Sequence, residues 1–253
     1  MWPDSTPAAR GTAPVAVLFD FNGVLVDDEE IHFEAFRRVL ARLGVPITRR
    51  LYDARYLALD DRTACAAALR DAGVPARRRT RAAVVTFVAR KRRQYRVLSG
   101  ERGIVVEPGA ARLVRALARR LPLAVVSGAA RAEVRDALRQ ARLLAAFACI
   151  VAAENVRRSK PHPEGYRRAL RLLRRTGRLA GAGGRGCVAI EDSPGGIRAA
   201  RAAGLAVLGV ATSYPPAVLR RAGAYAVVPS LARPTRALAL LGLAPGGVRR
   251  RRG

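Results

Sequence analysis

Residues 15–27 read Val-Ala-Val-Leu-Phe-Asp-Phe-Asn-Gly-Val-Leu-Val-Asp, an apolar run that is interrupted by a carboxylate at Asp20. The first five residues, 15–19, are apolar and rich in β-branched side chains, a pattern typical of a strand buried on both faces. Such strands occur in parallel sheets, which bind ligands at the carboxyl ends of their strands. The run therefore predicts a parallel sheet with Asp20 at its ligand-binding edge.

Further apolar runs of strand length follow along the chain, at residues 123–126, 148–151, 187–190, 206–210 and 224–228. Helical patterns lie between them, at residues 110–120, 131–141, 164–175, 196–203 and 216–222. Strands that alternate with helices predict an α/β fold with a doubly wound, Rossmann-like parallel sheet.

One interval breaks this alternation. Between residues 28 and 99 we find helical patterns at 30–43, 62–72 and 77–95 and no convincing strand. About seventy residues is too long for one crossover, so we expect a small all-helical cap domain inserted after the first strand. The expected domains are a core of residues 14–27 and 100–245, a cap of residues 28–99, and disordered tails at 1–13 and 246–253.

The net charge is +28, and all but two of the 47 basic residues are arginine. The arginines are spread along helical faces between alanines and leucines, a usage typical of a chain from a high-GC genome. No recognition motif accompanies the charge, so we expect no specific nucleic-acid partner, although non-specific binding at low salt follows from the charge.

Three cysteines, Cys65, Cys149 and Cys187, lie far apart and indicate reduced thiols, not a disulfide framework. The chain has no apolar run of membrane-spanning length, and residues 1–13 lack the pattern of a secretory signal. We therefore expect a cytoplasmic protein with no membrane partner. The sequence does not indicate an oligomeric state.

Polar residues directly follow three predicted strands, and Lys160 lies a few residues beyond a fourth. The segments around them are Phe-Asp-Phe-Asn-Gly-Val-Leu-Val-Asp at 19–27, Val-Val-Ser-Gly at 125–128, Ser-Lys-Pro-His-Pro at 159–163 and Ile-Glu-Asp-Ser-Pro-Gly-Gly-Ile at 190–197. In order and spacing they resemble the four motifs of the haloacid dehalogenase superfamily. The helical insert falls where that family places its first type of cap, and the resemblance spans about residues 15–228.

The resemblance implies a phosphate-ester hydrolase in which Asp20 attacks phosphorus and forms an aspartyl-phosphate. Mg²⁺ is the implied cofactor, because two anions must approach each other and this cation prefers oxygen ligands. The implied metal ligands are Asp20, the backbone carbonyl of Asn22, Asp192 and, directly or through water, Glu191. The implied substrate is a small phosphorylated metabolite.

The same resemblance implies residues that bind the phosphate group. Ser127 and backbone N–H groups near Gly128 would hydrogen-bond phosphate oxygens, and Lys160 would neutralise charge on the nucleophile and the transferring group. Ser127 could also be the N-cap of the following helix, alone or in addition to binding phosphate. In the cap, His32 matches a histidine near the active site of the mutase-like branch, and Arg62 matches a basic residue that contacts substrate phosphate in sugar-phosphate mutases.

Asn22 departs from the family pattern, since the hydrolases carry a second aspartate at this position as general acid and base. An amide exchanges no proton near neutral pH, and loss of such a group costs about 10²–10⁴ in rate. Three interpretations remain open. In the first, another group such as His32 or Asp27 acts as the acid, or the substrate has a good leaving group that needs none. In the second, the protein binds phosphate esters but turns them over very slowly. In the third, Asn22 deamidates to a carboxylate, because Gly23 follows it.

The sequence thus favours a Mg²⁺-dependent phosphatase. The alternative within the same chemistry is a β-phosphoglucomutase-like phosphosugar mutase, which needs two phosphate sites. Another class is a catalytically retired protein that binds a phosphate ligand or has a regulatory role, for which Asn22 is the main argument. Dehalogenation is disfavoured, because it does not need the carboxylate pair Glu191-Asp192.

Overall fold

The structure is a computed structural model that describes residues 13–57, 59, 61–179 and 184–243. The chain divides into two compact units, one formed by Met1–Asp27 and Val105–Gly253 and the other by Asp28–Ile104. Apart from Ala13, the tails predicted at 1–13 and 246–253 lie outside the described residues.

The first unit is built on a six-stranded parallel sheet with the strand order β3-β2-β1-β4-β5-β6. Each strand lies within two residues of its predicted position, which confirms the predicted parallel α/β sheet. The order reverses between β1 and β4, the place where open sheets bind ligands. The strands are β1 (Ala16–Phe19), β2 (Leu123–Val126), β3 (Phe147–Val151), β4 (Cys187–Glu191), β5 (Ala206–Val210) and β6 (Ala226–Val228).

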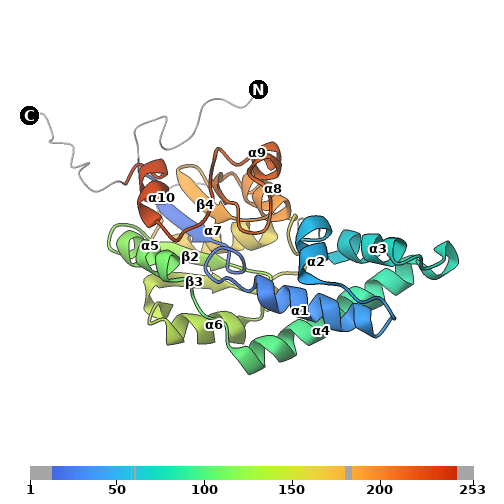
Figure 1. Cartoon of the computed structure of the whole chain (residues 1–253). Coiled ribbons are helices and arrows are strands. Elements are labelled where there is room, and N and C mark those ends of the chain that lie inside the picture. Colours follow the sequence, from blue (N-terminus) through green and yellow to red (C-terminus); the bar gives the residue numbers. More distant parts are fainter. Residues whose placement is uncertain (1–12, 58, 60, 180–183, 244–253) are drawn as a thin grey trace, which may run out of the picture. The chain divides into compact units, whose positions relative to one another are not determined.

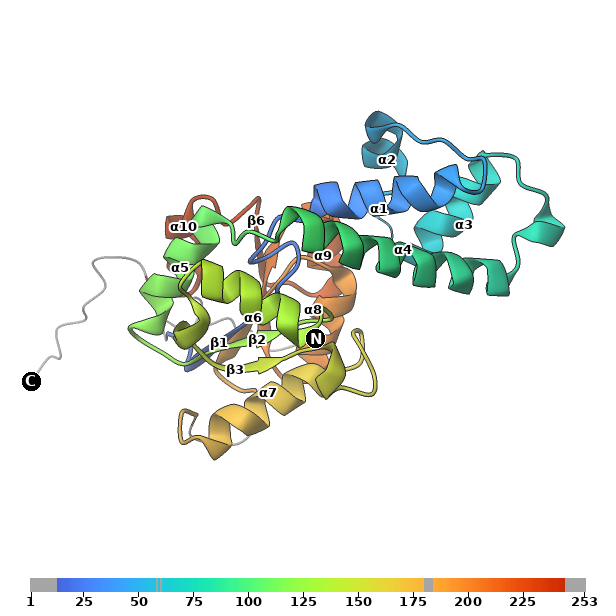
Figure 2. The same cartoon turned by 90° about the horizontal axis from the view of Figure 1, so that it is seen from below.

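Helices cover both faces of this sheet (Figures 1 and 2). One face carries α5 (Pro108–Ala118), α6 (Arg131–Gln140) and α10 (Pro234–Leu240), and the other carries α7 (Glu164–Arg175), α8 (Pro194–Ala202) and α9 (Pro216–Ala222). Two short 3-10 turns, η2 (Leu144–Ala146) and η3 (Ala153–Asn155), flank β3. Helix α10 was not predicted; it follows the last predicted strand, where the alternation of strands and helices gave no reason to expect another helix.

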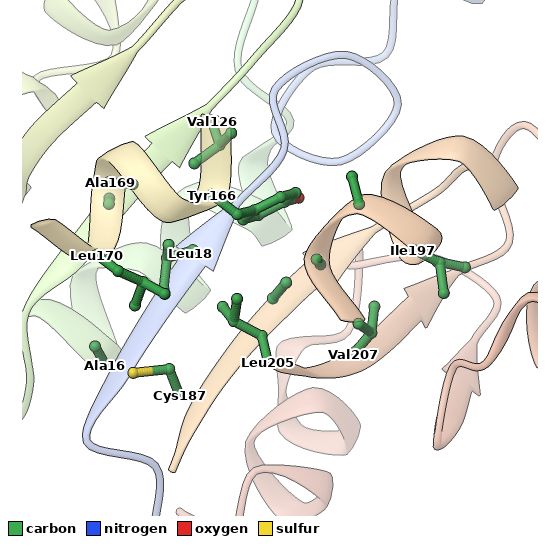
Figure 3. Close-up of a cluster of buried hydrophobic side chains, with 14 of the residues drawn as sticks. Ala16, Leu18, Val126, Tyr166, Ala169, Leu170, Cys187, Ile197, Leu205 and Val207 are labelled. Atoms are coloured by element: carbon green, nitrogen blue, oxygen red, sulfur yellow. The ribbon is translucent and has the colours of Figure 1, made fainter. Parts of the chain in front are cut away.

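The core between the sheet and α7–α9 is drawn in Figure 3. Successive side chains of a strand point to opposite faces, so Ala16 and Leu18 of β1 face this core. Tyr166 of α7 is the largest of the fully buried side chains described. A buried hydroxyl needs a hydrogen-bond partner, and the partner of Tyr166 belongs to the site described below.

The second unit is helical within the part of the chain that the structure describes. Its core is rich in aromatic side chains, and the rings of Phe36 and Phe87 meet edge to face with their centroids 5.3 Å apart. Its elements are α1 (Glu29–Ala41), α2 (Arg49–Arg55), α3 (Asp61–Asp71), η1 (Ala76–Arg78) and α4 (Arg81–Arg102).

Two features of this unit differ from the sequence prediction. Helix α2 was missed because it buries only Tyr52, which leaves no apolar face to recognise. Its one sequence signal was Thr48, the N-cap residue. The hydroxyl of Thr48 accepts the N–H of Leu51 at 3.2 Å. Helix α4 continues to Arg102, so the unit ends at Ile104, five residues beyond the expected boundary at residue 99.

None of the helices described in the chain is both long and apolar enough to span a bilayer.

Candidate active site

Three carboxylates meet at the carboxyl edge of the sheet. Asp20 directly follows β1, Glu191 is the last residue of β4, and Asp192 follows it. The pairing of β1 with β4 continues past the strand end, where the N–H of Asp20 donates to the carbonyl of Ile190 at 3.0 Å. All three side chains are buried, and one oxygen atom from each lies within 4.8 Å of the others. Such a group of hard oxygen donors suits a divalent cation.

Lys160 supplies the positive charge at this edge. Its Nζ atom lies 2.6 Å from Oδ1 of Asp20 and 2.6 Å from Oε1 of Glu191. The residue comes from the loop between η3 and α7, far along the chain from both carboxylates. One compact ammonium group therefore bridges the carboxylates that end two neighbouring strands.

Burial and the charges of neighbouring groups shift the pKa values of these side chains. Burial and, after it, the charge of Glu191 raise the pKa of Asp20 to about 7, against the opposing effect of Lys160. Burial, followed by the charges of Asp20 and Glu191, raises the pKa of Asp192 well above its ordinary value. Burial alone would lower the pKa of Lys160, but the two carboxylates outweigh it and raise that pKa. A second cation beside the carboxylates would favour their ionised forms.

Polar side chains hold these carboxylates in place, and a glycine leaves room for one of them. The hydroxyl of Tyr166 donates to Oε1 of Glu191 at 2.7 Å, and the hydroxyl of Ser193 donates to Oε2 at 3.3 Å. The hydroxyl of Ser213 donates to Oδ2 of Asp192. A Cβ atom on Gly196 would overlap the carboxylate of Glu191.

Sequence reasoning missed these supporting residues. Ser213 follows the end of β5 by three residues, so a search extended to polar residues a few positions beyond each strand, as for Lys160, could have found it. Tyr166 gave no signal, because a buried aromatic residue on an amphipathic helix is the ordinary pattern of a core. Burial and Glu191 raise the pKa of the Tyr166 hydroxyl well above its ordinary value, so the group remains a donor.

Ser127 and Gly128 follow β2 at the same edge of the sheet. Strand β2 pairs with β1, with Val125 opposite Phe19. The Ser127 side chain is buried, and its Oγ atom accepts the N–H of Ala129 at 2.9 Å. Helix α6 begins later, with Ala130 as its N-cap, so the alternative interpretation of Ser127 as the helix N-cap is wrong.

Asn22 lies in a tight turn directly after Asp20 and is half-buried. The N–H of Gly23 donates to the carbonyl of Val26 at 2.9 Å, and the hydroxyl of Thr212 donates to the carbonyl of Gly23. Gly23 has φ +71°, a conformation in the left-handed region that favours glycine. The turn thus fixes the backbone on both sides of Gly23, directly after Asn22.

The remaining predicted residues, His32 and Arg62, belong to the helical unit. Nδ1 of His32 lies 2.6 Å from Nζ of Lys91, and Nε2 lies 3.3 Å from Oδ2 of Asp28. Both ring nitrogens therefore have partners within that unit, which counts against His32 as the replacement acid. Arg62 is exposed on α3. The structure brings together Asp20, Lys160, Glu191 and Asp192, and it leaves His32 and Arg62 in a separate unit.

A lysine bridges buried carboxylates at the switch point of this parallel α/β sheet, the place where open sheets bind ligands. The family model described as haloacid dehalogenase-like hydrolase matches residues 15–204. The chain therefore belongs to the haloacid dehalogenase-like hydrolases, and the resemblance noted in its four motifs is confirmed.

Several proteins are similar to this chain over most of its length. It is 32% identical to protein CbbY of Cupriavidus necator, over 87% of this chain and 86% of that protein. It is 30% identical to a phosphorylated carbohydrates phosphatase of Thermotoga maritima, over 84% of this chain and 93% of that protein. It is 26% identical to the β-phosphoglucomutase of Bacillus subtilis, over 79% of this chain and 84% of that protein.

Among solved structures, a haloacid dehalogenase (HAD) family hydrolase from Deinococcus radiodurans with bound phosphate and sodium is 32% identical. The match covers 92% of this chain and 98% of that one, with a TM-score of 0.66. The expected Rossmann-like α/β fold and the expected class of enzyme, a hydrolase of the haloacid dehalogenase family, are therefore confirmed.

Proposed function

We propose that the protein hydrolyses the phosphomonoester of a small phosphorylated carbohydrate, with Asp20 as the nucleophile and Mg²⁺ as the cofactor. The observation that carries the proposal is the contact of the Lys160 ammonium with Asp20 and Glu191, beside Asp192. The Thermotoga maritima relative supports the substrate class, because it is named for phosphorylated carbohydrates.

The donor set fits Mg²⁺, since all three clustered side chains are carboxylates and no soft ligand is among them. The carboxylates of Asp20 and Asp192 and the backbone carbonyl of Asn22 would hold the ion, with Glu191 in contact directly or through water. When bound, Mg²⁺ would screen the negative charges of the nucleophile and the phosphate from each other.

The protein side chains would then carry out two displacements. A carboxylate oxygen of Asp20 attacks phosphorus, the bond from phosphorus to the ester oxygen breaks, and an aspartyl-phosphate forms. Water next attacks phosphorus, releases inorganic phosphate and regenerates the Asp20 carboxylate. Lys160 balances charge in both steps, and Ser127 together with N–H groups near Gly128 binds phosphate oxygens.

Asn22 makes leaving-group protonation the weak step of this scheme. The amide cannot donate the proton that the departing alkoxide needs, so an ester of an acidic alcohol or phenol is turned over more easily than a sugar phosphate. We propose slow turnover of ordinary phosphate esters, with metal binding and nucleophile placement retained.

The test is hydrolysis of p-nitrophenyl phosphate and of a panel of phosphorylated sugars with Mg²⁺, by wild type, Asn22→Asp and Asp20→Asn. We expect wild-type turnover that Asp20→Asn abolishes, and sugar-phosphate turnover about 10²–10⁴-fold faster in Asn22→Asp. A silent wild type that Asn22→Asp rescues would support a retired phosphate-binding protein. Silence of both variants and of the wild type would end the phosphatase proposal.

A second candidate is a phosphosugar mutase, which the similarity to a β-phosphoglucomutase favours. Arg62 is the residue that separates the two candidates, because a mutase needs a second phosphate site. Arg62→Ala should then remove most of the isomerisation of a hexose phosphate and affect p-nitrophenyl phosphate hydrolysis less. Arg70→Ala, at another exposed arginine of α3, is the matched control.

We also propose that the positively charged surface of the protein binds polyanions without sequence selectivity. Helix α7 buries Leu170 and Leu173 and exposes arginines on its other face, at Arg167, Arg168, Arg171 and Arg175. Binding of duplex DNA should therefore fall steeply with salt and should not depend on sequence. We also propose a cytoplasmic location, because three cysteines this far apart in the sequence indicate a reducing compartment and not a disulfide framework.

A further inference from the structure

We infer that Tyr166 is a positioning residue, which fixes the carboxylate of Glu191 and, through it, the ammonium of Lys160. The inference rests on the proposed function, because it assigns Tyr166 to the support of the metal and phosphate site. No motif quoted above includes this residue, and its helix otherwise serves the core.

The first observation is that the hydrogen bond of the Tyr166 hydroxyl is buried. Tyr166 is fully buried, and its ring is packed among aliphatic side chains of β1, β2 and α7 (Figure 3). Its hydroxyl donates to Oε1 of Glu191 at 2.7 Å. Glu191 is itself fully buried, so this hydrogen bond joins two polar groups that are out of reach of bulk water and is expensive to lose.

The second observation is the contact of the same ring with Lys160. Nζ of Lys160 lies 5.4 Å from the centroid of the Tyr166 ring and 2.6 Å from Oε1 of Glu191. Oε1 thus accepts two donors, Tyr166 and Lys160, whereas the contact of Oε2 with Ser193 is longer, at 3.3 Å. Tyr166 therefore holds Glu191 in the orientation that the ammonium requires, and a cation–π contact adds to the placement of Lys160.

The third observation is that α7 holds both Tyr166 and the loop that carries Lys160. The carboxylate of Glu164, at the start of α7, accepts the N–H groups of Arg157 at 2.9 Å and Arg158 at 3.1 Å. A Cβ atom on Gly165 would crowd Cγ1 of Val126, so the first turn of α7 lies close against β2. The position of Tyr166 is therefore set by the core, not by the site it serves.

The test is Tyr166→Phe, which removes the hydroxyl and keeps the ring. We expect Mg²⁺ affinity, measured by isothermal titration calorimetry, to fall about tenfold, as is usual when a group that orients a metal ligand is removed. The kcat for p-nitrophenyl phosphate at saturating Mg²⁺ should also fall about tenfold, and KM should change little, because the phosphate-binding groups remain.

The matched control is Tyr225→Phe, which removes the hydrogen bond from another tyrosine hydroxyl to the carbonyl of Leu240 at 3.2 Å. This variant should keep wild-type Mg²⁺ affinity and kcat. Thermal melting of both variants checks that each remains folded at the assay temperature. If Tyr166→Phe and Tyr225→Phe gave the same Mg²⁺ affinity, the inference would be wrong.

A double-mutant cycle separates positioning from a general loss of packing. In a Glu191→Gln background Tyr166→Phe should have less than a twofold further effect on Mg²⁺ affinity, since the carboxylate that it positions is already gone. A tenfold effect in both backgrounds would overturn the inference and leave the proposed function intact. A wild type that bound no Mg²⁺ and hydrolysed no ester would defeat the proposed function, and the inference with it.

Discussion

Nζ of Lys160 lies 2.6 Å from Oδ1 of Asp20, although 140 positions separate the two residues in the sequence. The lysine is one of two in a chain whose other basic residues are all arginine. A compact ammonium can contact Asp20 and Glu191 together, whereas a planar guanidinium requires more room and binds a carboxylate side-on. The choice of lysine here therefore has a steric reason.

We predict that Lys160→Arg, although it preserves the charge, lowers kcat for p-nitrophenyl phosphate by about 10²–10³, the effect of losing one donor that stabilises the transition state. Steady-state kinetics at saturating Mg²⁺ provide the measurement. Arg168→Lys, an exposed position on α7, makes the reverse exchange outside the site and should leave kcat unchanged. Near-normal turnover by Lys160→Arg would show that charge alone suffices.

Neighbouring glycines at the start of α8 offer a second prediction. A Cβ atom on Gly196 would overlap the Glu191 carboxylate, whereas one on Gly195 would meet nothing within 4 Å. Gly196→Ala should therefore displace Glu191 and weaken Mg²⁺ binding by about tenfold or more. Gly195→Ala should leave Mg²⁺ affinity unchanged and should not lower the melting temperature, because alanine favours a helix over glycine.

Calorimetric titration of both glycine variants with Mg²⁺ distinguishes steric displacement from a general effect of the substitution. Equal Mg²⁺ affinities would contradict the close contact between Gly196 and Glu191. A drop in melting temperature confined to Gly196→Ala would agree with it.

The sheet could be predicted from the sequence because its strands are buried along most of their length. A strand covered on both faces must be apolar throughout, so residues 123–126 and 206–210 were located without error. The same rule located Asp20 and Asp192, because a carboxylate directly after such a strand interrupts an otherwise apolar run. Lys160 stood out for a different reason, as a rare lysine in a chain rich in arginine.

The supporting contacts could not be predicted, because they depend on three-dimensional packing. Tyr166 reaches Glu191 only because α7 crosses the sheet close to β2, and the helical period places it in the core like any apolar residue. Helix α2 was missed because it is short and half exposed. Nothing in the sequence period marks its seven residues as a helix.

The turn after Asp20 leads to a prediction about the amide of Asn22. Deamidation at an Asn-Gly pair requires the backbone nitrogen of the glycine to attack the side chain. In this structure the N–H of Gly23 donates to the carbonyl of Val26 at 2.9 Å, and the turn is held further by Thr212. We therefore predict that the folded protein keeps Asn22 as an amide.

Peptide mapping of fresh and aged protein should find asparagine at position 22 in both, with constant specific activity. Protein aged in denaturant, where the turn is lost, is the positive control and should accumulate aspartate and isoaspartate. Conversion in the folded protein together with rising activity would instead support deamidation as the source of the missing carboxylate.

The helical unit contains an ion-pair group on α1 that makes its stability depend on pH. Nε and one terminal nitrogen of Arg37 lie 2.7 and 2.8 Å from the two carboxylate oxygens of Glu34, and Nε of Arg38 lies 2.8 Å from one of them. The hydrogen bond from Arg37, followed by that from Arg38, lowers the pKa of Glu34 from its ordinary 4.5 to about 2.

Because the folded pKa lies below the ordinary value, the ionised carboxylate stabilises the fold above pH 4.5, and this contribution is lost as the pH falls towards 2. The arginines are partly exposed, so we expect Glu34→Gln to lower the free energy of unfolding by only about 1 kcal/mol at pH 7. The difference from wild type should shrink at pH 3. Urea denaturation followed by circular dichroism at the two pH values measures this difference in the free energy of unfolding.

The control is Asp136→Asn, which removes an exposed ion pair with Arg139 on α6 and should have a smaller effect at pH 7. A Glu34→Gln effect that stayed the same at both pH values would place its origin in packing and not in the charge of Glu34.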